Sequence, residues 1–250
     1  MEGAGRGARW FEPRFFFQLE GFAHRDLFHG VQYVWEALQR LPQYLAARLR
    51  PRLAGRIYPG AYVGEQVELG EGCVVEPGAV ILGPAIVGPG TVVRQGAYLR
   101  EYCLVGAGCV VGHATEMKGS VLLDGAQAPH FNYVGDSILG RRVNLGAGTK
   151  LSNLKNDGSP VAVRGPQGER IATGMRKLGA ILGDGVALGC NCVTNPGTLV
   201  GPESLVYANL VVRGFVPPRQ VVKLRQELEM VPRQVPPDRG APGGGQEQGP

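Results

Sequence analysis

Two cations, Arg100 and Lys118, each stand directly after an aliphatic residue. Arg100 follows Leu99, and Lys118 follows Met117. If their separation, three times a six-residue repeat, makes one coil of a regular solenoid, the two side chains stack in neighbouring coils, about 4.8 Å apart at the backbone. Two positive charges this close repel each other, and an anion between them would reverse the sign of the interaction. We expect a phosphate group there, with two side chains splayed into solvent as the alternative.

A histidine stands where a periodic pattern in the sequence breaks. His130 follows Pro129, and imidazole is suited to act as a general base near neutral pH. Proline has no amide hydrogen for a strand ladder, so we predict a bulge there. The bulge would re-aim His130 and return the chain one residue out of register at Val134. The alternative is a surface histidine at an irregular turn.

Metal chemistry has less support than general-base chemistry. His113 lies nearly one coil before His130 in the sequence, but zinc would need a third imidazole. The remaining histidines, His24 and His29, lie in the N-terminal segment, and the CNC motif that begins at Cys190 does not have the spacing of a zinc site. We therefore expect no metal.

A six-residue repeat is the element that must position these side chains. Every sixth residue from Ile57 to Leu123 is aliphatic, and glycine often follows it, as in VGEQVE, LGEGCV, VGPGTV and VGAGCV. A small or β-branched residue recurs four places later, and Cys73, Cys103 and Cys109 occupy such positions. This period is typical of a β-helix in which three hexapeptides form one triangular coil. The aliphatic side chain points inward, and glycine suits turns with positive φ.

The repeat divides the chain into segments. The predicted prism spans residues 57–217, and an excursion at 155–179 interrupts it where the period is lost. Residues 1–56 predict a helical cap over the open first coil. A short closing helix is expected at 218–230, and residues 231–250 have so little to bury that they predict disorder.

Within the N-terminal segment, apolar residues at helical spacing run from Leu27 to Leu38. Pro42 should interrupt this helix, with a second short helix after it.

The excursion is rich in cations. It carries Lys155, Arg164, Arg170, Arg176 and Lys177 against two carboxylates. A solvated loop is one interpretation. The other is contact with the phosphates of a donor molecule, for which we single out Lys177 as a cofactor-binding residue.

Composition excludes several classes of protein. The net charge of +5 is too small and scattered to favour nucleic acid binding, though it suits an anionic small ligand. No apolar run is long enough for a membrane span, and no secretory signal is evident at the N-terminus. The 5 cysteines, an odd number, favour a reduced compartment, and so a cytoplasmic location, over a disulfide framework.

Three stretches carry a resemblance to a known family: YLREYCLVGAGCVVGHATEMKGSVL, HFNYVGDSILGRRVNLGAGTKLSN and TGMRKLGAILGDGVALGCNCVTNPGTLVG. They are similar to the acyltransferase half of the bifunctional sugar-1-phosphate nucleotidyltransferase/acetyltransferases, over about residues 57–216. The best-known member acetylates glucosamine 1-phosphate with acetyl-CoA. The resemblance implies a left-handed parallel β-helix and a homotrimer with its sites between neighbouring prisms.

The resemblance also implies roles for individual residues. His130 matches the base that takes the amine proton, and Glu116 resembles the carboxylate that supports it. The matched substrate contacts are Arg100 and Lys118 for the sugar phosphate, Tyr133 and Asn144 for the sugar, and Asn153 for the sugar or acetyl group. The backbone of Cys190 and Ala208, which have the same spacing as the two cations, matches the coenzyme A groove.

The sequence also departs from this family. No nucleotidyltransferase domain precedes the prism, and the stretch SNLKNDG lacks the tyrosine usual in the bacterial enzymes, which makes it look more like the archaeal members. We expect an acetyl-CoA-dependent N-acetyltransferase that acts on a hexosamine 1-phosphate in amino-sugar nucleotide biosynthesis. Two alternatives remain: a non-catalytic trimeric scaffold or regulatory subunit, and an acyltransferase for a nucleotide-linked amino sugar.

Overall fold

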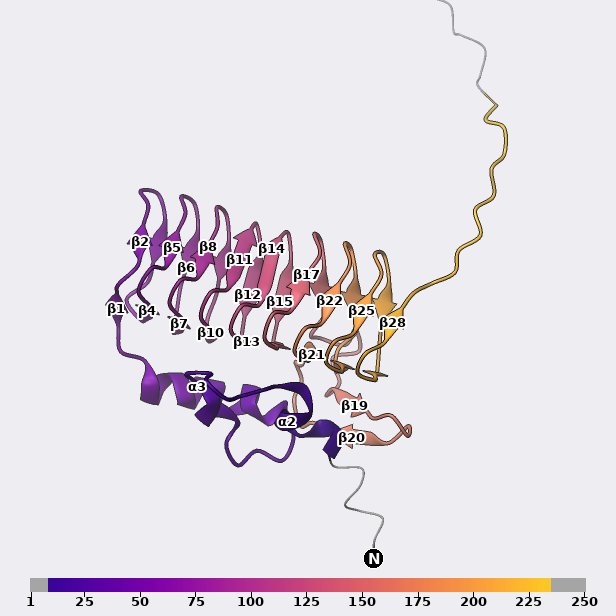
Figure 1. Cartoon of the computed structure of the whole chain (residues 1–250), viewed down its shortest axis with the longest axis horizontal. Coiled ribbons are helices and arrows are strands. Elements are labelled where there is room, and N and C mark those ends of the chain that lie inside the picture. The colour runs from indigo at the N-terminus through magenta and orange to yellow at the C-terminus, as the bar shows by residue number, and fades with distance from the viewer. Residues whose placement is uncertain (1–8, 235–250) are drawn as a thin grey trace, which may run out of the picture.

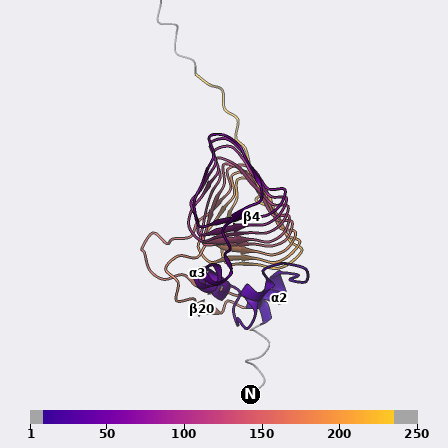
Figure 2. The same ribbon diagram turned by 90° about the vertical axis from the view of Figure 1, so that its left-hand side faces the viewer.

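The computed structural model describes residues 9–234 and shows a solenoid of short parallel strands (Figure 1). Seen end-on in Figure 2, its cross-section is a triangle. Each coil adds one strand to each of three sheets, because the chain turns twice within a coil and once more to reach the next. The predicted parallel β-helix is confirmed.

Each face of the prism is one parallel sheet, with its strands in chain order. The nine strands of the first face are β1 (Arg52–Leu53), β4 (Val67–Leu69), β7 (Ala85–Val87), β10 (Cys103–Val105), β13 (Ser120–Leu122), β16 (Ile138–Leu139), β21 (Ala180–Leu182), β24 (Thr198–Val200) and β27 (Phe215–Val216). The nine strands of the second face are β2 (Arg56–Ile57), β5 (Val74–Val75), β8 (Val92–Val93), β11 (Val110–His113), β14 (Gln127–His130), β17 (Asn144–Leu145), β22 (Ala187–Leu188), β25 (Leu205–Val206) and β28 (Val221–Val222). The eight strands of the third face are β3 (Tyr62–Val63), β6 (Val80–Ile81), β9 (Tyr98–Leu99), β12 (Glu116–Lys118), β15 (Tyr133–Gly135), β18 (Lys150–Leu151), β23 (Val193–Thr194) and β26 (Val211–Val212).

The prism is filled by the aliphatic residues of the repeat, as the period predicts. Val105, Val111 and Leu145 are fully buried, and the small residues Cys103 and Cys109 lie beside them. All five cysteines are free thiols.

The repeat breaks earlier than predicted. Glu116 pairs with Tyr98 in the coil before it and with Tyr133 in the coil after it, and the second interval is one residue shorter than the first. The turn at Gly119, where φ is +53°, is one residue shorter than the corresponding turn of the preceding coil. The core residue that follows is Leu122, whereas Leu123 packs outside the prism.

The bulge predicted at Pro129 is therefore wrong. Ala128, not Pro129, occupies the core position, and β14 continues through Pro129 to His130. His130 pairs in register with His113, so it ends a regular strand.

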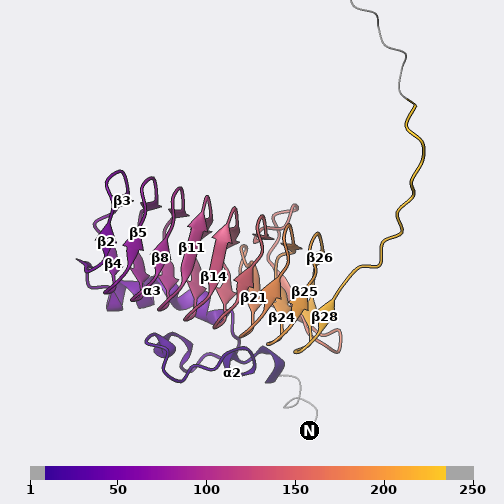
Figure 3. The ribbon, with the colours of Figure 1, turned by 45° about the horizontal axis from the view of Figure 1, so that its top comes forward.

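The N-terminal segment covers a face of the prism rather than the open first coil, which corrects the prediction. It consists of η1 (Arg9–Phe11), α2 (Pro13–Phe16), η2 (Arg25–Phe28) and α3 (Glu36–Arg48), and it runs along the first face in Figures 1 to 3. Trp35, Leu41 and Leu45 pack in one cluster with Leu104 and Ile181 of that face.

The helix boundaries also differ from the prediction. The apolar residues expected on one helix from Leu27 to Leu38 are divided among η2, the non-helical connection at 29–35 and α3, and α3 continues through Pro42. An interior proline costs a helix about 3 kcal/mol. Burial of Leu38, Leu41 and Leu45 along one side of α3 offsets that cost.

The excursion leaves the prism after β18 and forms an antiparallel hairpin of β19 (Ala162–Arg164) and β20 (Arg170–Ala172). The helix predicted at 218–230 is wrong, because β28 ends the solenoid and no regular element follows it up to residue 234. Leu224 and Leu228 remain largely in solvent, with exposures of 61% and 87%. Most of the disorder predicted at 231–250 falls outside the described residues. No helix among residues 9–234 is long and apolar enough to cross a membrane.

Candidate functional site

Apart from Lys177 on the excursion, the residues singled out above lie on two edges of the prism and on the faces beside them. The His130 edge, where the second face turns into the third, carries His113, His130, Ala147, Cys190 and Ala208. The Lys118 edge, where the third face turns into the first, carries Arg100, Lys118, Asp136 and Asn153. The third face lies between the edges and presents Glu116 and Tyr133.

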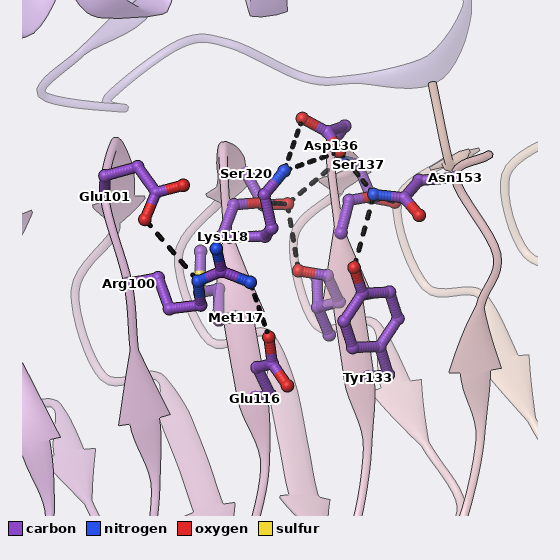
Figure 4. Close-up of polar contacts among 12 residues, drawn as sticks. Arg100, Glu101, Glu116, Met117, Lys118, Ser120, Tyr133, Asp136, Ser137 and Asn153 are labelled. Carbon is purple, nitrogen blue, oxygen red and sulfur yellow. Dashed lines mark hydrogen bonds and ion pairs between the residues drawn. The ribbon is translucent and has the colours of Figure 1, made fainter. Parts of the chain in front are cut away.

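An ordered polar cluster occupies the Lys118 edge (Figure 4). Lys118 Nζ lies 2.9 and 3.1 Å from the two carboxylate oxygens of Asp136. These side chains are only 10% and 17% exposed. Asn153 Nδ2 donates to the same carboxylate, and also to the Tyr133 hydroxyl at 3.3 Å. The structure therefore brings Lys118, Tyr133 and Asn153 together around the carboxylate of Asp136, a residue that the sequence analysis did not single out.

Asp136 is the residue that the sequence reasoning missed. It follows Lys118 at the same sequence interval at which Lys118 follows Arg100, so the spacing that linked the two cations would have found it. Its backbone takes a left-handed φ of +45°, which few side chains other than Asp and Asn tolerate. Its amide donates to the carbonyl of Lys118 at 2.9 Å, which fixes the turn against the preceding coil.

Arg100 is held by a different set of carboxylates. Its Nη1 donates to Glu116 Oε1 at 3.0 Å, and its Nε lies 3.5 Å from Glu101. The two stacked cations are thus not an unbalanced pair, because each already has a partner. Arg100 remains about one third exposed, so its ion pairs contribute little to stability and are open to exchange with a ligand.

Glu116 does not support His130 in this structure. Its carboxylate accepts from Arg100, and no described residue hydrogen-bonds the His130 imidazole. Burial raises the pKa of the Tyr133 phenol above its ordinary value, so this hydroxyl stays protonated at neutral pH. Tyr133 therefore keeps a proton to donate while it accepts from Asn153.

His130 is the more available of two histidines on its edge. Its amide donates to Asn132 Oδ1 at 3.1 Å, while its side chain is exposed. His113 Nδ1 donates to the carbonyl of Gln95 at 3.0 Å, and its ring meets Phe131 edge-on at 5.0 Å. Phe131 has a left-handed φ of +52°, a strained conformation for a bulky residue. Such outliers are common beside functional sites.

Successive turns of the His130 edge stack by backbone hydrogen bonds. Gly148 donates to the carbonyl of His130 at 3.0 Å, Asn191 to that of Ala147 at 2.8 Å, and Asn209 to that of Cys190 at 2.8 Å. In contrast, the amides of Ala147, Cys190 and Ala208 donate to no other residue between 9 and 234. The edge beyond His130 is therefore a row of N–H donors open to a ligand, and the Cys190 side chain is exposed there.

Two predicted contacts lie apart from these groups in a single chain. Asn144 is exposed on the outward side of the second face, where it pairs with Gln127. Lys177 is exposed on the excursion, where it bridges to Leu154 beside the Lys118 edge rather than the edge of Cys190 and Ala208. Within residues 9–234, no three His, Cys, Asp or Glu side chains are placed to hold a metal ion.

Comparisons with known proteins agree with the repeat. Residues 81–223 match the family model described as the GMPPB C-terminal domain. The chain is 43% identical over 211 residues to the bifunctional protein GlmU of Methanococcus maripaludis strain C7, a match that covers 84% of this chain and 51% of that protein. It is also 43% identical over 101 residues to a bifunctional sugar-1-phosphate nucleotidylyltransferase/acetyltransferase of Sulfurisphaera tokodaii, over 40% of this chain and 25% of that protein.

A solved UDP-N-acetylglucosamine acyltransferase from Campylobacter jejuni is similar at 16% identity with a TM-score of 0.46, over 65% of this chain and 69% of that one. The chain spans about half the length of the archaeal GlmU protein that it matches along most of its own length. Since the family model covers more than half of the chain, this protein belongs to the GMPPB C-terminal domain family.

Proposed function

We propose that the protein is an N-acetyltransferase that moves the acetyl group of acetyl-CoA to the amine of a hexosamine 1-phosphate. The observation that carries this proposal is the exposed imidazole of His130, which has no partner among residues 9–234, at the head of a row of similarly unpaired backbone amides. A base and oxyanion donors on one edge are what acyl transfer to an amine requires. The printed names of the archaeal relatives, a GlmU and a sugar-1-phosphate nucleotidylyltransferase/acetyltransferase, favour the same chemistry.

The reaction exchanges one C–S bond for one C–N bond and removes two protons from the substrate nitrogen. His130 takes a proton from the substrate ammonium, because a protonated amine is not a nucleophile. The amine attacks the thioester carbonyl and a C–N bond forms. As the C–S bond breaks, the nitrogen gives up a second proton to become the amide nitrogen. One of the two protons ends on the coenzyme A sulfur, which leaves as a thiol, and the other goes to solvent. The amide of Ala147 belongs to the turn of the next coil, which stacks on His130 through the amide of Gly148, and is the donor we assign to the oxyanion. The amides of Cys190 and Ala208 would line the path of the donor beyond it.

The acceptor would lie along the third face toward the Lys118 edge. Arg100 is the cation most open to the sugar phosphate, which would compete with Glu116 for the guanidinium. Lys118, Tyr133 and Asn153 form a preorganised set of donors beside it. Asp136 balances Lys118 in the absence of ligand.

We also propose a homotrimer with sites between chains. The N-terminal segment covers the first face, but large apolar side chains remain exposed on the other two: Tyr62 at 56% and Val211 at 67% on the third, and Val221 at 56% on the second. Packing three prisms through these faces would bring Asn144 and Lys177 of one chain toward the site of another. Light scattering should give a mass near three chains, and a monomer at micromolar concentration would exclude intersubunit sites.

Five free thiols suit the reducing cytoplasm, where we place the protein.

Release of free coenzyme A thiol tests the activity directly. Acetyl-CoA is incubated with glucosamine 1-phosphate, galactosamine 1-phosphate, the unphosphorylated amino sugars and a UDP-linked amino sugar. We expect thiol release with a sugar 1-phosphate and its loss in His130→Ala, while His113→Ala on the same edge remains active. No thiol release with any acceptor would favour a non-catalytic scaffold. Preference for the UDP-linked sugar would move the acceptor to the nucleotide-sugar class.

A further inference from the structure

A cavity of about 550 Å³ lies between the excursion and the Lys118 edge of the last coils. The excursion contributes Lys155, Arg164 and Arg170 to its lining, and the coils contribute Asn195 and Arg213. Its volume is in the range of small-molecule sites, which is about 300–1,000 Å³. None of the residues assigned above to acetyl transfer lines this cavity.

The cavity has an excess of positive charge. Arg164, Arg170 and Arg213 form no ion pair with any residue of the described chain. The carboxylate of Asp157, also in the lining, lies 3.4 Å from Lys155 and accepts from the amide and hydroxyl of Ser159. Three arginines that line one cavity are therefore in no ion pair with residues 9–234, and the carboxylate of Asp157 in the same lining pairs with Lys155 instead.

The hairpin places two of these cations directly opposite each other. Arg164 of β19 pairs in register with Arg170 of β20. Like charges at directly opposed positions destabilise a strand pair. An anion bound between the strands and the prism would remove that cost, so the arrangement suits a ligand better than an empty surface.

The other side of the hairpin is anchored, which prevents the cations from moving apart freely. Val163, between Ala162 and Arg164, is fully buried against the N-terminal segment. Gln39 of α3 donates to the carbonyl of Thr173 at 3.0 Å. At Gly197 the hairpin approaches the prism so closely that an added Cβ would lie 2.8 Å from Val161. The cationic side is thus held toward the cavity before any ligand binds.

We propose that this cavity binds a ligand carrying two or more phosphate groups. The planar guanidinium fork matches phosphate oxygens. Three guanidinium groups carry more positive charge than the roughly 1.5 to 2 negative charges of a single phosphate monoester, so a ligand with two or more phosphates balances them better. Two sources share this chemistry: the adenosine phosphates of coenzyme A, and the diphosphate of a nucleotide or nucleotide-linked sugar. The proposal does not depend on acetyl transfer, because it rests on residues outside that site.

Calorimetric titration of the full chain with pyrophosphate, coenzyme A and UDP tests the proposal. We expect wild type to bind pyrophosphate and Arg170→Ala and Arg213→Ala each to weaken it by about tenfold or more. Arg170→Lys keeps the positive charge but loses the planar guanidinium fork, so its affinity for pyrophosphate should lie between those of wild type and Arg170→Ala. Arg219→Ala is the control, since Arg219 is an exposed arginine that lies outside the cavity. Melting temperatures confirm that each variant is folded.

The other arms identify the source of the phosphates. If the two alanine variants weaken coenzyme A as they weaken pyrophosphate, the ligand is the acetyl donor. If they weaken UDP and leave coenzyme A unchanged, it is a nucleotide. Both results support the proposal. It is overturned if wild type does not bind pyrophosphate, or if Arg219→Ala weakens binding as much as Arg213→Ala. Thiol release without pyrophosphate binding would sink this inference alone, and the reverse result would sink only the proposed acetyl transfer.

Discussion

The first and third faces of the prism are built from the same repeat but carry opposite outward surfaces. On the first face the outward residues Leu104, Val121 and Ile181 are apolar and fully buried under the N-terminal segment. On the third face the corresponding positions include Glu116 and Tyr133, which face outward beside the polar cluster (Figure 4). The inward side chains are aliphatic in both.

The difference shows where function is encoded in such a fold. The core constrains two positions in six, one aliphatic and one small, and the outward position beside the aliphatic residue is free to serve another purpose. On the first face it packs against the N-terminal segment, and on the third it lies at the surface, where we have proposed that the acceptor binds. Substitutions at matched outward positions should therefore affect stability on one face and catalysis on the other.

The largest effect on stability is expected on the covered face. Leu104→Ala removes a fully buried side chain between the prism and the N-terminal segment and should cost about 2–5 kcal/mol in the free energy of unfolding. Leu224→Ala makes the same change at a 61% exposed position and should cost less than about 0.5 kcal/mol. Urea unfolding measures both, and equal losses would show that the N-terminal segment does not cover the first face in solution.

Lys118→Ala should lower stability even though Lys118 belongs to the third face, because it leaves the largely buried carboxylate of Asp136 without its cation. Breaking such a pair costs about 3 kcal/mol. The double variant Lys118→Ala/Asp136→Ala removes both charges and should recover part of this loss. Chemical denaturation of the three proteins measures the coupling, and additive losses would mean that the ion pair is absent in solution.

Arg100→Ala should separate catalysis from stability. Its ion pairs are exposed to solvent, so the melting temperature should change little. Loss of a charge-assisted bond to phosphate should raise KM for the sugar 1-phosphate by roughly 10- to 150-fold, and KM for the unphosphorylated amino sugar far less. Steady-state kinetics with both acceptors measure the difference. A similar rise for each would place the phosphate elsewhere.

The smallest effect is a pH dependence on the covered side. Burial, aided by Arg48, lowers the pKa of His24 below its ordinary value of 6.5, and its Nδ1 lies 3.0 Å from the Tyr44 hydroxyl. The unfolded chain then binds a proton more readily than the folded one, so this contribution is present above about pH 6.5 and is lost as pH falls through the folded pKa. Between about pH 7.5 and about pH 5.5, wild type should lose more stability than His24→Phe. Equal losses of stability in wild type and His24→Phe would show that His24 does not contribute to this pH dependence.

The period of the sequence predicted the prism, the stacking of Arg100 above Lys118 and the excursion, because an inward aliphatic residue every six positions admits few other structures. It could not place the break. Leu122 and Leu123 are both aliphatic, and the outward one tolerates its apolar side chain since the N-terminal segment covers it. The six-residue period therefore predicted a break at Pro129, whereas the coil is already one residue shorter at the turn of Gly119.

Tertiary contacts decided the remaining differences. Pro42 should end a helix, but burial of both neighbouring turns of α3 against the first face keeps the helix continuous. Leu224 and Leu228 have helical spacing, yet their exposure shows that a helix there would have no surface to cover within residues 9–234 of one chain. The pairing of Arg100 with Glu116 depends on side-chain direction across two coils, which spacing does not specify.

The rate of acetyl transfer as a function of pH in wild type, His130→Ala and His113→Ala tests the central claim that the His130 edge is a site of acyl transfer. His130 is exposed at the end of β14 and adds little to the core, so all three proteins should have nearly the same melting temperature. Turnover by His130→Ala should fall by roughly 10²–10⁴, and the loss should shrink as pH rises and the free amine becomes abundant. His113→Ala should keep most of its activity. A His130→Ala protein with wild-type turnover and pH profile would contradict the account.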